Sequence, residues 1–537
     1  MPPKKIKKAR KVASKAERAA MDPHSHAFMA KFHDVFRFHG AATRGSDFSP
    51  GSALFEGRFG RMFRTLPPGE FVEDDLRELA KKMIAEHEVR PTSELKDDDE
   101  ENQGITAGYT YLGQFIDHDL TFDPASSLDR QNDPEALEDF RTPRFDLDSV
   151  YGRGPIDQPY LYDDKGMRML LGRKLTGVAH DRRTRDLPRN TPHGGRQRAL
   201  IGDPRNDENV IVSQLQATML RFHNSMVDSM TKGSKPPKFE EVQNAVRWHY
   251  QWVVLHDFLP TIAGQDVVHD VLPHLKNGTG IHEDKPKLRF FHFEKFPFMP
   301  IEFSAAVYRF GHSMVRPIYR LNASLRQRQF ILSENERRSL TGFREFRPDF
   351  AVDWSLFFKM GEAPPKGRRR LQKSYKIDTS LVNPLGKLPK VIGDKHPSLA
   401  ERNLIRGLRM DLPSGQTVAR YMDKKVIDDD DLRIGKATEG DHKKNPRLTK
   451  LFPKFKDNAP LWYYILAEAQ QGFRDNTTPI RLGPVGGRIV AEVFIGLLLG
   501  DQCSFLSQDP SWRPNKEFFD TECKFGMAEL IKQALKA

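Results

Sequence analysis

The chain has 537 residues and a mass of 61.6 kDa, enough for two or three ordinary domains or one large one. Its 38% of apolar residues can bury a core, but the longest apolar run, residues 489–499, contains Glu492. That run is shorter than the roughly 20 residues that a bilayer span needs, so we expect no membrane span. The basic start lacks the apolar segment of a secretory signal peptide, which predicts a cytoplasmic location or export by a non-classical route.

The formal net charge is +12, and residues 1–18 alone carry +7 of it. We therefore expect residues 1–20 to form a basic, disordered tail, and nucleic-acid binding is not expected as the main function because the rest of the chain is nearly balanced. The two cysteines, Cys503 and Cys523, exclude a disulfide-stapled scaffold and fit a reducing compartment.

Helical periodicity dominates the remaining sequence, and alternating strand patterns are few. Apolar residues recur every three or four positions over residues 211–226 and 303–314, each of which predicts an amphipathic helix. Residues 483–500 predict a buried helix closed by Gly500. The pattern predicts a mainly α-helical protein with long irregular connections and little β-structure, and such connections usually carry a site.

Residues 109–124, YTYLGQFIDHDLTFDP, place polar groups among apolar ones. In a helix Gln114 and His118 project the same way, with Asp117 and Asp119 on either side of the histidine. Burying these groups needs a metal, a cofactor or a cation as partner, whereas a solvent-facing cluster needs none. The residues alone do not decide between a buried site with such a partner and a solvent-facing cluster.

Residues 142–152, TPRFDLDSVYG, alternate carboxylates with apolar side chains. Asp146, Asp148 and the hydroxyl of Thr142 could offer oxygen ligands to a hard cation, above all Ca²⁺, although the loop is not an EF-hand. A solvated carboxylate pair is the alternative.

Three further segments carry charged or imidazole groups. In GDPRNDEN, residues 202–209, Arg205 and Glu208 can share one face at a helix entrance or form an ordinary ion pair. In residues 305–317, a helical wheel places His312 opposite the apolar stripe, near Arg309, where it could be an axial ligand or simply exposed. In residues 400–414, Asn403 and Arg406 are three apart; an asparagine can accept an imidazole N–H, and an arginine can bind a carboxylate.

Together, QFIDHD, FDLDSVYG, GDPRNDEN, RFGH and NLIRG, in this order, resemble the animal-type haem peroxidase family, which includes the myelo- and lactoperoxidases, the cyclooxygenases and many bacterial members. The resemblance runs from about residue 109 to 403, with a further family-like stretch at LGPVGGRIVAEV. It implies a single large helical haem-peroxidase domain over residues 21–537. In its scarcity of cysteines and its lack of a recognisable signal peptide, the sequence resembles the bacterial members more than the secreted mammalian ones.

The resemblance also implies residue roles around a haem b. His118 is similar to the distal histidine that moves a proton between the peroxide oxygens, and Arg205 to the arginine that stabilises charge as their bond breaks. Gln114 matches a residue that orders water or halide over the iron. His312 looks like the proximal iron ligand, with Asn403 accepting its N–H.

The remaining roles concern haem attachment and calcium. Arg309 and Arg406 match cations that hold haem propionates, and Asp117 and Glu208 match carboxylates that can form esters to haem. A sulfonium link is excluded because Asn209 stands where myeloperoxidase-like enzymes have methionine. The implied calcium ligands are Asp119, Thr142, Arg144 through its carbonyl, Asp146 and Asp148.

The expected function is therefore that of a haem peroxidase, which reduces hydrogen peroxide and oxidises small electron donors, with halides and thiocyanate as candidates. One alternative is a fatty-acid dioxygenase of cyclooxygenase type, but its radical-forming tyrosine would stand where this chain has Arg309, with Tyr308 one residue out of register. Another is a catalytically silent calcium- or haem-binding adhesion protein, which would be expected to have lost His118 or Arg205. This chain keeps both.

Overall fold

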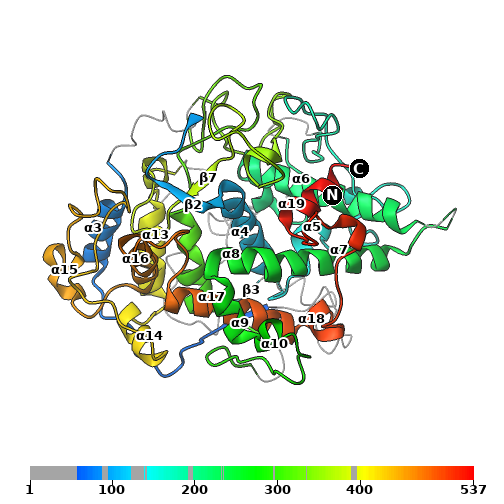
Figure 1. Ribbon diagram of the computed structural model, residues 1–537. Helices are drawn as coiled ribbons and strands as arrows, with labels where there is room; N and C mark the ends of the chain where they lie inside the picture. The colour runs from blue at the N-terminus through cyan, green and yellow to red at the C-terminus, as the bar shows by residue number, and fades with distance from the viewer. Residues whose placement is uncertain are drawn as a thin grey trace, which may run out of the picture. The chain divides into compact units, whose positions relative to one another are not determined.

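The computed structural model describes residues 57–86, 95–121, 138–139, 142–191, 197–231, 233, 235–293, 297–333, 335–388 and 396–537. Helix accounts for 42% and strand for 8%, which confirms the expected mainly α-helical class with little β-structure (Figure 1). Residues 57–537 form one compact unit. The expected basic tail, residues 1–20, and the expected domain start at residue 21 lie outside the described residues.

The α-helices range from single turns to the 21 residues of α6. Those of the first half are α3 (Glu73–Met83), α4 (Ala107–Leu120), α5 (Asp148–Tyr151), α6 (Val210–Met230), α7 (Phe239–Val253), α8 (Leu259–Ala263), α9 (Gln265–Val271) and α10 (Pro273–Asn277). Those of the second half are α11 (Ile301–Ala305), α13 (Leu399–Arg409), α14 (Gly415–Tyr421), α15 (Leu448–Leu451), α16 (Leu461–Arg474), α17 (Pro484–Gly500), α18 (Phe505–Gln508) and α19 (Met527–Ala534).

Short 3₁₀ segments and one π-helical segment join these helices. They are η5 (Pro159–Leu161), η6 (Pro204–Asp207), the π-helical η7 (Val254–Phe258), η8 (Val307–His312), η9 (Trp354–Leu356), η10 (Asn383–Gly386), η11 (Pro453–Phe455) and η12 (Lys516–Phe518).

Among the described residues, the strands form three small sheets. They are β1 (Gly57–Gly60), β2 (Glu101–Thr106), β3 (Glu138–Asp139), β4 (Met299–Pro300), β5 (Ile318–Tyr319), β6 (Gln329–Phe330) and β7 (Lys373–Tyr375). The order of the first sheet is β3-β1-β4, with Gly57 opposite Asp139 in an antiparallel pair and Phe59 opposite Met299 in a parallel one. The antiparallel pairs β2–β7 and β5–β6 make the other two.

Helix α6 lies at the centre of the core and is buried on every side from Val210 to Val227. The sequence correctly predicted a helix here, but an amphipathic one with a single apolar face. Its polar side chains are buried with partners of their own: Ser213 donates to Asp207, and Asn206 donates to Gln216. An apolar periodicity cannot distinguish such partnered polar residues from a solvated face.

Helix α17 confirms the buried C-terminal helix, and it ends at Gly500 as expected. Its first turn is capped from α16, because the buried carboxylate of Glu468 accepts hydrogen bonds from the backbone N–H groups of Val485 and Gly486 at 3.0–3.1 Å. A carboxylate at a helix N-terminus satisfies otherwise unpaired N–H groups and complements the helix dipole.

The helix predicted over residues 303–314 is wrong as a continuous element. Helix α11 ends at Ala305, the backbone leaves helical geometry at Ala306 (φ −131°, ψ −67°), and η8 continues as a 3₁₀ turn to His312. Positions calculated at 100° per residue therefore do not hold beyond Ala306, although Phe303, Val307, Phe310 and Met314 are all buried.

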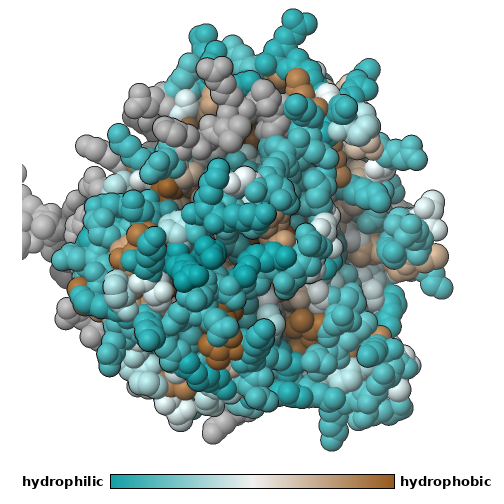
Figure 2. All heavy atoms as spheres, turned by 60° about the vertical axis from the view of Figure 1, so that its left-hand side comes forward, coloured by the Kyte–Doolittle hydropathy of each residue, from teal (hydrophilic) through white to brown (hydrophobic). Residues whose placement is uncertain are grey.

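The surface face that carries α3, α14 and α15 is mostly hydrophilic, with apolar side chains in separate small spots (Figure 2). The exposed large side chains of these helices include Tyr421 of α14, 48% exposed, and Leu451 of α15, 39% exposed. None of the helices in the described part of the chain is both long and apolar enough to cross a membrane. Cys503 and Cys523 are free thiols at the surface.

Candidate functional site

A cavity of about 350 Å³ opens between α4, η6, η8 and α13. This volume falls within the range of small-molecule and cofactor pockets. Nine residues to which the sequence assigned haem-site roles line it together: Gln114, Asp117, His118, Arg205, Glu208, Arg309, His312, Asn403 and Arg406. Apolar side chains, including Val315, Leu332 and Leu388, supply much of the remaining wall.

His118, in the last turn of α4, is a buried imidazole. Its Nδ1 lies 2.7 Å from Oδ1 of Asn206. Burial, and then the charge of Arg205, lowers the pKa of His118 to about 4, so the ring is neutral at neutral pH. Since the amide oxygen can only accept, Nδ1 carries the proton and Nε2 carries the lone pair. Nε2 can therefore act as a proton acceptor.

Arg205 is fixed in the cavity wall by the carboxylate behind it. Asp203, which has no solvent exposure, accepts hydrogen bonds from Nε and Nη2 of Arg205 at 2.7–3.2 Å and from its backbone N–H at 2.8 Å. Nη2 also donates to the backbone carbonyl of His118 at 2.9 Å. The cation is thus held in one orientation beside the imidazole, the arrangement that preorganised electrostatic stabilisation requires.

Gln114 is held from both ends of its amide. Nε2 donates to Glu208, and Oε1 accepts a hydrogen bond of 3.1 Å from Nδ2 of Asn209. Asn209 is also the N-cap of α6, because its Oδ1 accepts from the N–H groups of Ile211 and Val212. Burial raises the pKa of Glu208 to about 7, against the opposing effect of Arg205, so this carboxyl changes charge near neutral pH.

His312 lies at the end of η8, with Nδ1 2.8 Å from Nδ2 of Asn403 on α13. Burial, and then the charge of Arg309, lowers the pKa of His312 to about 3, which keeps the imidazole neutral as a metal ligand must be. In this orientation the amide donates and Nδ1 accepts. Metal ligation through Nε2 requires the amide to turn over, so that its oxygen accepts the Nδ1 proton.

Arg309 and Asp117 form an ion pair across the cavity wall, with Nη1 and Oδ2 3.1 Å apart. Burial raises the pKa of Asp117, but Arg309, with smaller contributions from His118, Arg205 and His312, outweighs burial, and the net shift is downward. Arg406 lies one helical turn after Arg402 on α13, and both line the cavity. The sequence did not single out Arg402, whose Nε donates to the carbonyl of His396 at 2.7 Å.

These residues fit a flat apolar cofactor that carries carboxylates and takes an axial imidazole. His312 offers the imidazole, and Arg309, Arg402 and Arg406 offer the cations. Gly311, beside His312, leaves room: it lines the cavity, and no atom lies within 4 Å of where its Cβ would stand.

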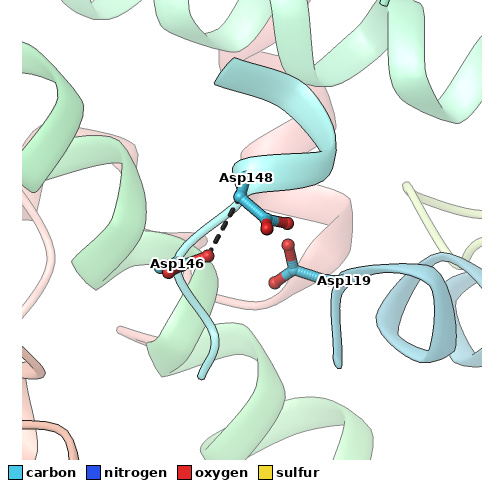
Figure 3. A group of neighbouring side chains, drawn as sticks. All are labelled: Asp119, Asp146 and Asp148. Carbon is cyan, nitrogen blue, oxygen red and sulfur yellow. Dashed lines mark hydrogen bonds between the residues drawn. The ribbon is translucent and has the colours of Figure 1, made fainter. Parts of the chain in front are cut away.

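The carboxylates of Asp119, Asp146 and Asp148 meet on the other side of α4's last turn, with ligand atoms within 4.8 Å of one another (Figure 3). Carboxylates this close repel each other unless a cation or a proton lies between them. Thr142 donates to Oδ2 of Asp146 at 2.7 Å, and the N–H of Arg144 donates to the carbonyl of Thr142. The structure thus brings three of the five expected oxygen ligands together, Asp119 from α4 and Asp146 and Asp148 from the loop, with Thr142 bonded to one of them.

The loop of this cluster contains a non-glycine residue in a left-handed backbone conformation. Leu147 adopts a left-handed conformation (φ 56°, ψ 34°), and its N–H donates to Oδ2 of Asp119 at 3.3 Å. Such a conformation costs a non-glycine residue about 1 kcal/mol or more and persists only where its surroundings hold it. Gly202 packs on the same loop, since a Cβ there would lie 2.5 Å from the carbonyl oxygen of Asp148.

Several residues that support this site went unrecognised in the sequence. Asp203 and Asn206 stand within GDPRNDEN, so the motif was found but their contacts were not. Ser149, which extends the network behind His118, likewise stands within FDLDSVYG, whereas Gln216 is a polar residue on a buried helix and gave no local signal.

The family model described as animal haem peroxidase matches residues 130–339, less than half of the chain. Among solved structures, peroxidase A from Dictyostelium discoideum is similar, with a TM-score of 0.54 and 16% identity over 88% of this chain and 89% of that one. An Oryza sativa fatty acid alpha-dioxygenase with palmitic acid matches with a TM-score of 0.50 and 14% identity over 87% of this chain and 78% of that one. No curated protein matches the sequence. The chain therefore shares the fold of these enzymes and, over residues 130–339, matches the sequence pattern of animal haem peroxidases.

Proposed function

We propose that this protein is a haem peroxidase of the animal haem peroxidase family, with its catalytic domain in residues 21–537, and that it reduces hydrogen peroxide and oxidises small donors. One observation carries the proposal: a single cavity holds a neutral His118 with its Nε2 lone pair available, a fixed Arg205 beside it, and a second neutral imidazole at His312. An acid–base group, a fixed cation and an axial ligand are the parts that peroxide cleavage needs.

The protein residues divide the work as follows. Nε2 of His118 takes the proton from the H₂O₂ oxygen that would face the cofactor. It then returns this proton to the other oxygen, which leaves as water. Arg205 stabilises the negative charge that develops on the departing oxygen, and Asp203 keeps the guanidinium in place during the step. A haem bound through His312 would supply the two electrons for this reduction and recover them from the donor.

The remaining cavity residues would hold the cofactor. Arg309 and Arg406, with Arg402, would bind its carboxylates. Asp117 and Glu208 would be the sites of ester bonds to haem. Since Asp117 is now paired with Arg309, an ester at Asp117 would release this cation toward a haem carboxylate. Ca²⁺ would join Asp119, Asp146 and Asp148, with Thr142 and the carbonyl of Arg144.

Halides and thiocyanate are proposed as electron donors whose oxidation is limited by the charge of Glu208. Gln114 is expected to order water or an anion above the cofactor, but its amide is held by Glu208 and Asn209. An ionised Glu208 beside that position repels an anion, so anion oxidation should be favoured where Glu208 is neutral.

Absorption spectra and rapid kinetics test the proposal. We expect the purified protein to bind one haem, and His312→Ala to lose the wild-type Soret band. His118→Ala should slow the reaction with H₂O₂ by about 10²–10⁴-fold. His223 offers a matched control, since it is also buried and has its pKa lowered to about 4, yet it bonds to Tyr151 and Met167 outside the cavity. A folded His118→Ala protein that reacts with H₂O₂ at the wild-type rate would refute His118 as the base and with it the mechanism proposed here.

The dioxygenase alternative has one observation in its favour. Tyr308 is buried, lines the cavity and donates its hydroxyl to the carbonyl of Gly113 at 3.2 Å. Burial raises its pKa well above the ordinary value, so the phenol stays protonated. Oxygen uptake with palmitic acid distinguishes the two enzymes: a peroxidase consumes no oxygen with it, whereas oxygen uptake that Tyr308→Phe abolishes would favour the dioxygenase.

A further inference from the structure

The imidazole of His118 is held from behind by a chain of two buried side-chain amides. Nδ1 of His118 meets Oδ1 of Asn206 at 2.7 Å, and Nδ2 of Asn206 donates to Oε1 of Gln216 at 2.9 Å. Neither Asn206 nor Gln216 is exposed to solvent, and neither lines the cavity. They come from η6 and α6, elements far from α4 in the sequence.

A backbone carbonyl at the end of the chain sets its direction. Nε2 of Gln216 lies 3.5 Å from the carbonyl oxygen of Ser149, which can only accept. Turning the Gln216 amide over would place two oxygens against each other and would remove the acceptor for Asn206. With Gln216 in this orientation, Asn206 presents its oxygen to His118, and the proton sits on Nδ1.

We propose that Asn206 and Gln216 are positioning residues that fix the tautomer of His118, so that Nε2 always faces the cavity as the proton acceptor. This inference rests on the proposed peroxidase function and deepens it. Without the acceptor on Nδ1, the tautomer with the proton on Nε2 becomes accessible, and in that form the ring cannot accept a proton from peroxide. Partners that orient metal-bound imidazoles are typically worth about 10–100-fold in affinity or activity, and we expect an effect of similar size at His118.

Two other buried histidines, His249 and His223, differ from His118 in the group that accepts their N–H. Nδ1 of His249 lies 2.7 Å from the carbonyl of Ala245, and Nε2 of His223 lies 2.8 Å from the carbonyl of Met167. A main-chain carbonyl remains a hydrogen-bond acceptor whichever side chain its residue carries. At His118 the acceptor is a side chain, so a single substitution removes it.

The test compares three variants of the haem-loaded full chain. Asn206→Leu removes the acceptor, and Asn206→Asp keeps an acceptor for Nδ1–H. Asn102→Leu is the matched control, because Asn102 is also unexposed and uses both ends of its amide, with the N–H and carbonyl of Ile480, outside the cavity. Gln216→Met is a second variant should Asn206→Leu fail to fold.

Two stopped-flow rates are measured for each: the reaction with H₂O₂, and the association of hydrogen cyanide, which must leave its proton on a base near the iron. We expect Asn206→Leu to lose about 10–100-fold in both rates, Asn206→Asp to keep most of them, and Asn102→Leu to keep both at lower thermal stability. Gln216→Met should lose less than Asn206→Leu, because it only frees the Asn206 amide to turn.

Wild-type rates in Asn206→Leu would overturn the inference, and so would equal losses in Asn206→Leu and Asn206→Asp, which would indicate a merely structural role. Equal losses in Asn102→Leu would do the same. A wild-type protein that binds cyanide but does not react with H₂O₂ would refute the proposed function alone, and the cyanide rates would still decide the role of Asn206.

Discussion

The two side chains proposed to act on peroxide are each held by a buried residue behind the cavity wall. Asn206 holds His118, and Asp203 holds Arg205. Ser149 connects both supports, since its carbonyl accepts from the N–H of Asp203 at 3.0 Å and faces Gln216. Groups fixed before the reaction need no reorganisation during it, which is where most electrostatic catalysis originates.

The nine polar residues assigned to the cavity could be predicted from the sequence, because each stands in a short, distinctive motif, whereas Arg402 and the apolar wall could not. The supports of these nine residues could not either. A hydrogen bond between Asn206 and Gln216 depends on how η6 packs against α6, and nothing in the spacing of the sequence encodes it. Equally, the sequence assigned Asp117 and Arg309 separate roles, whereas in the structure they pair with each other.

Glu208 should make anion binding depend on pH. Its pKa is about 7, so it becomes negative as the pH rises through that value and repels an anion near Gln114. We expect thiocyanate affinity, followed by the haem absorption before any exposure to peroxide, to fall by about tenfold between about pH 6 and pH 8. In Glu208→Gln the affinity should stay nearly constant over this range. An unchanged pH dependence in the variant would assign it to another group.

At the scale of elements, the site is built where helices end or break. His118 and Asp119 occupy the last turn of α4, Asn209 caps α6, and His312 ends a 3₁₀ segment that follows the break at Ala306. The sequence predicted a helix at α6 and considered one at α4, but it continued the helix of residues 303–314 across Ala306, because the apolar spacing stays near 3.6 residues through the break. The break itself depends on the packing of α11 and η8 against α17 and α16.

The carboxylate cluster joins the last turn of α4 to the loop that enters α5, so the loss of a bound cation should disturb the side of the cavity that holds His118. Asp119 is adjacent to His118, and Oγ of Ser149 donates to Oδ1 of Asp119 at 3.2 Å. A displacement of about 1 Å at the base can cost on the order of a hundredfold in rate. We therefore expect thorough chelation, or Asp148→Asn, to lower both the melting temperature and the peroxide rate.

Asp430→Asn is the control for this experiment, because Asp430 pairs with Arg447 at the surface. Its peroxide rate should equal that of the wild type. Chelation that leaves both the melting temperature and the rate unchanged would remove calcium from the proposal without affecting the haem site.

Glu468 should make stability depend on pH through the cap of α17. Burial raises its pKa to about 7 against an ordinary value of 4.5. The folded state therefore binds a proton that the unfolded state releases, and this stabilisation, present at low pH, is lost as the pH rises from about 4.5 to 7. The shift corresponds to about 3 kcal/mol. Glu468→Gln should flatten this part of the unfolding free energy measured against pH; an identical slope would refute the assignment.

At the scale of the whole molecule, the cavity is where distant parts of the chain meet. Residues from 109 to 406 line it, so a bound cofactor would contact α4, η6, η8 and α13 at once. The helical class and the order of motifs could be predicted from the sequence. The convergence could not, because long irregular segments separate the motifs and their paths depend on buried polar contacts, such as those of Glu101 with Arg316 and Arg370.

A cofactor that bridges these elements should stabilise the entire compact unit. A ligand that binds only the folded state adds about 4 kcal/mol at a free concentration of 1,000 times its Kd. We expect haem to raise the unfolding temperature of the wild type but not that of Gly311→Leu, whose side chain would extend into the cavity.

Gly440→Leu is the matched control, since Gly440 also has open space at its Cβ but does not line the cavity. Without haem, both variants should unfold close to the wild-type temperature, because neither new side chain meets an atom within 4 Å of its Cβ. Haem stabilisation retained in Gly311→Leu would place the cofactor elsewhere and would refute His312 as its ligand.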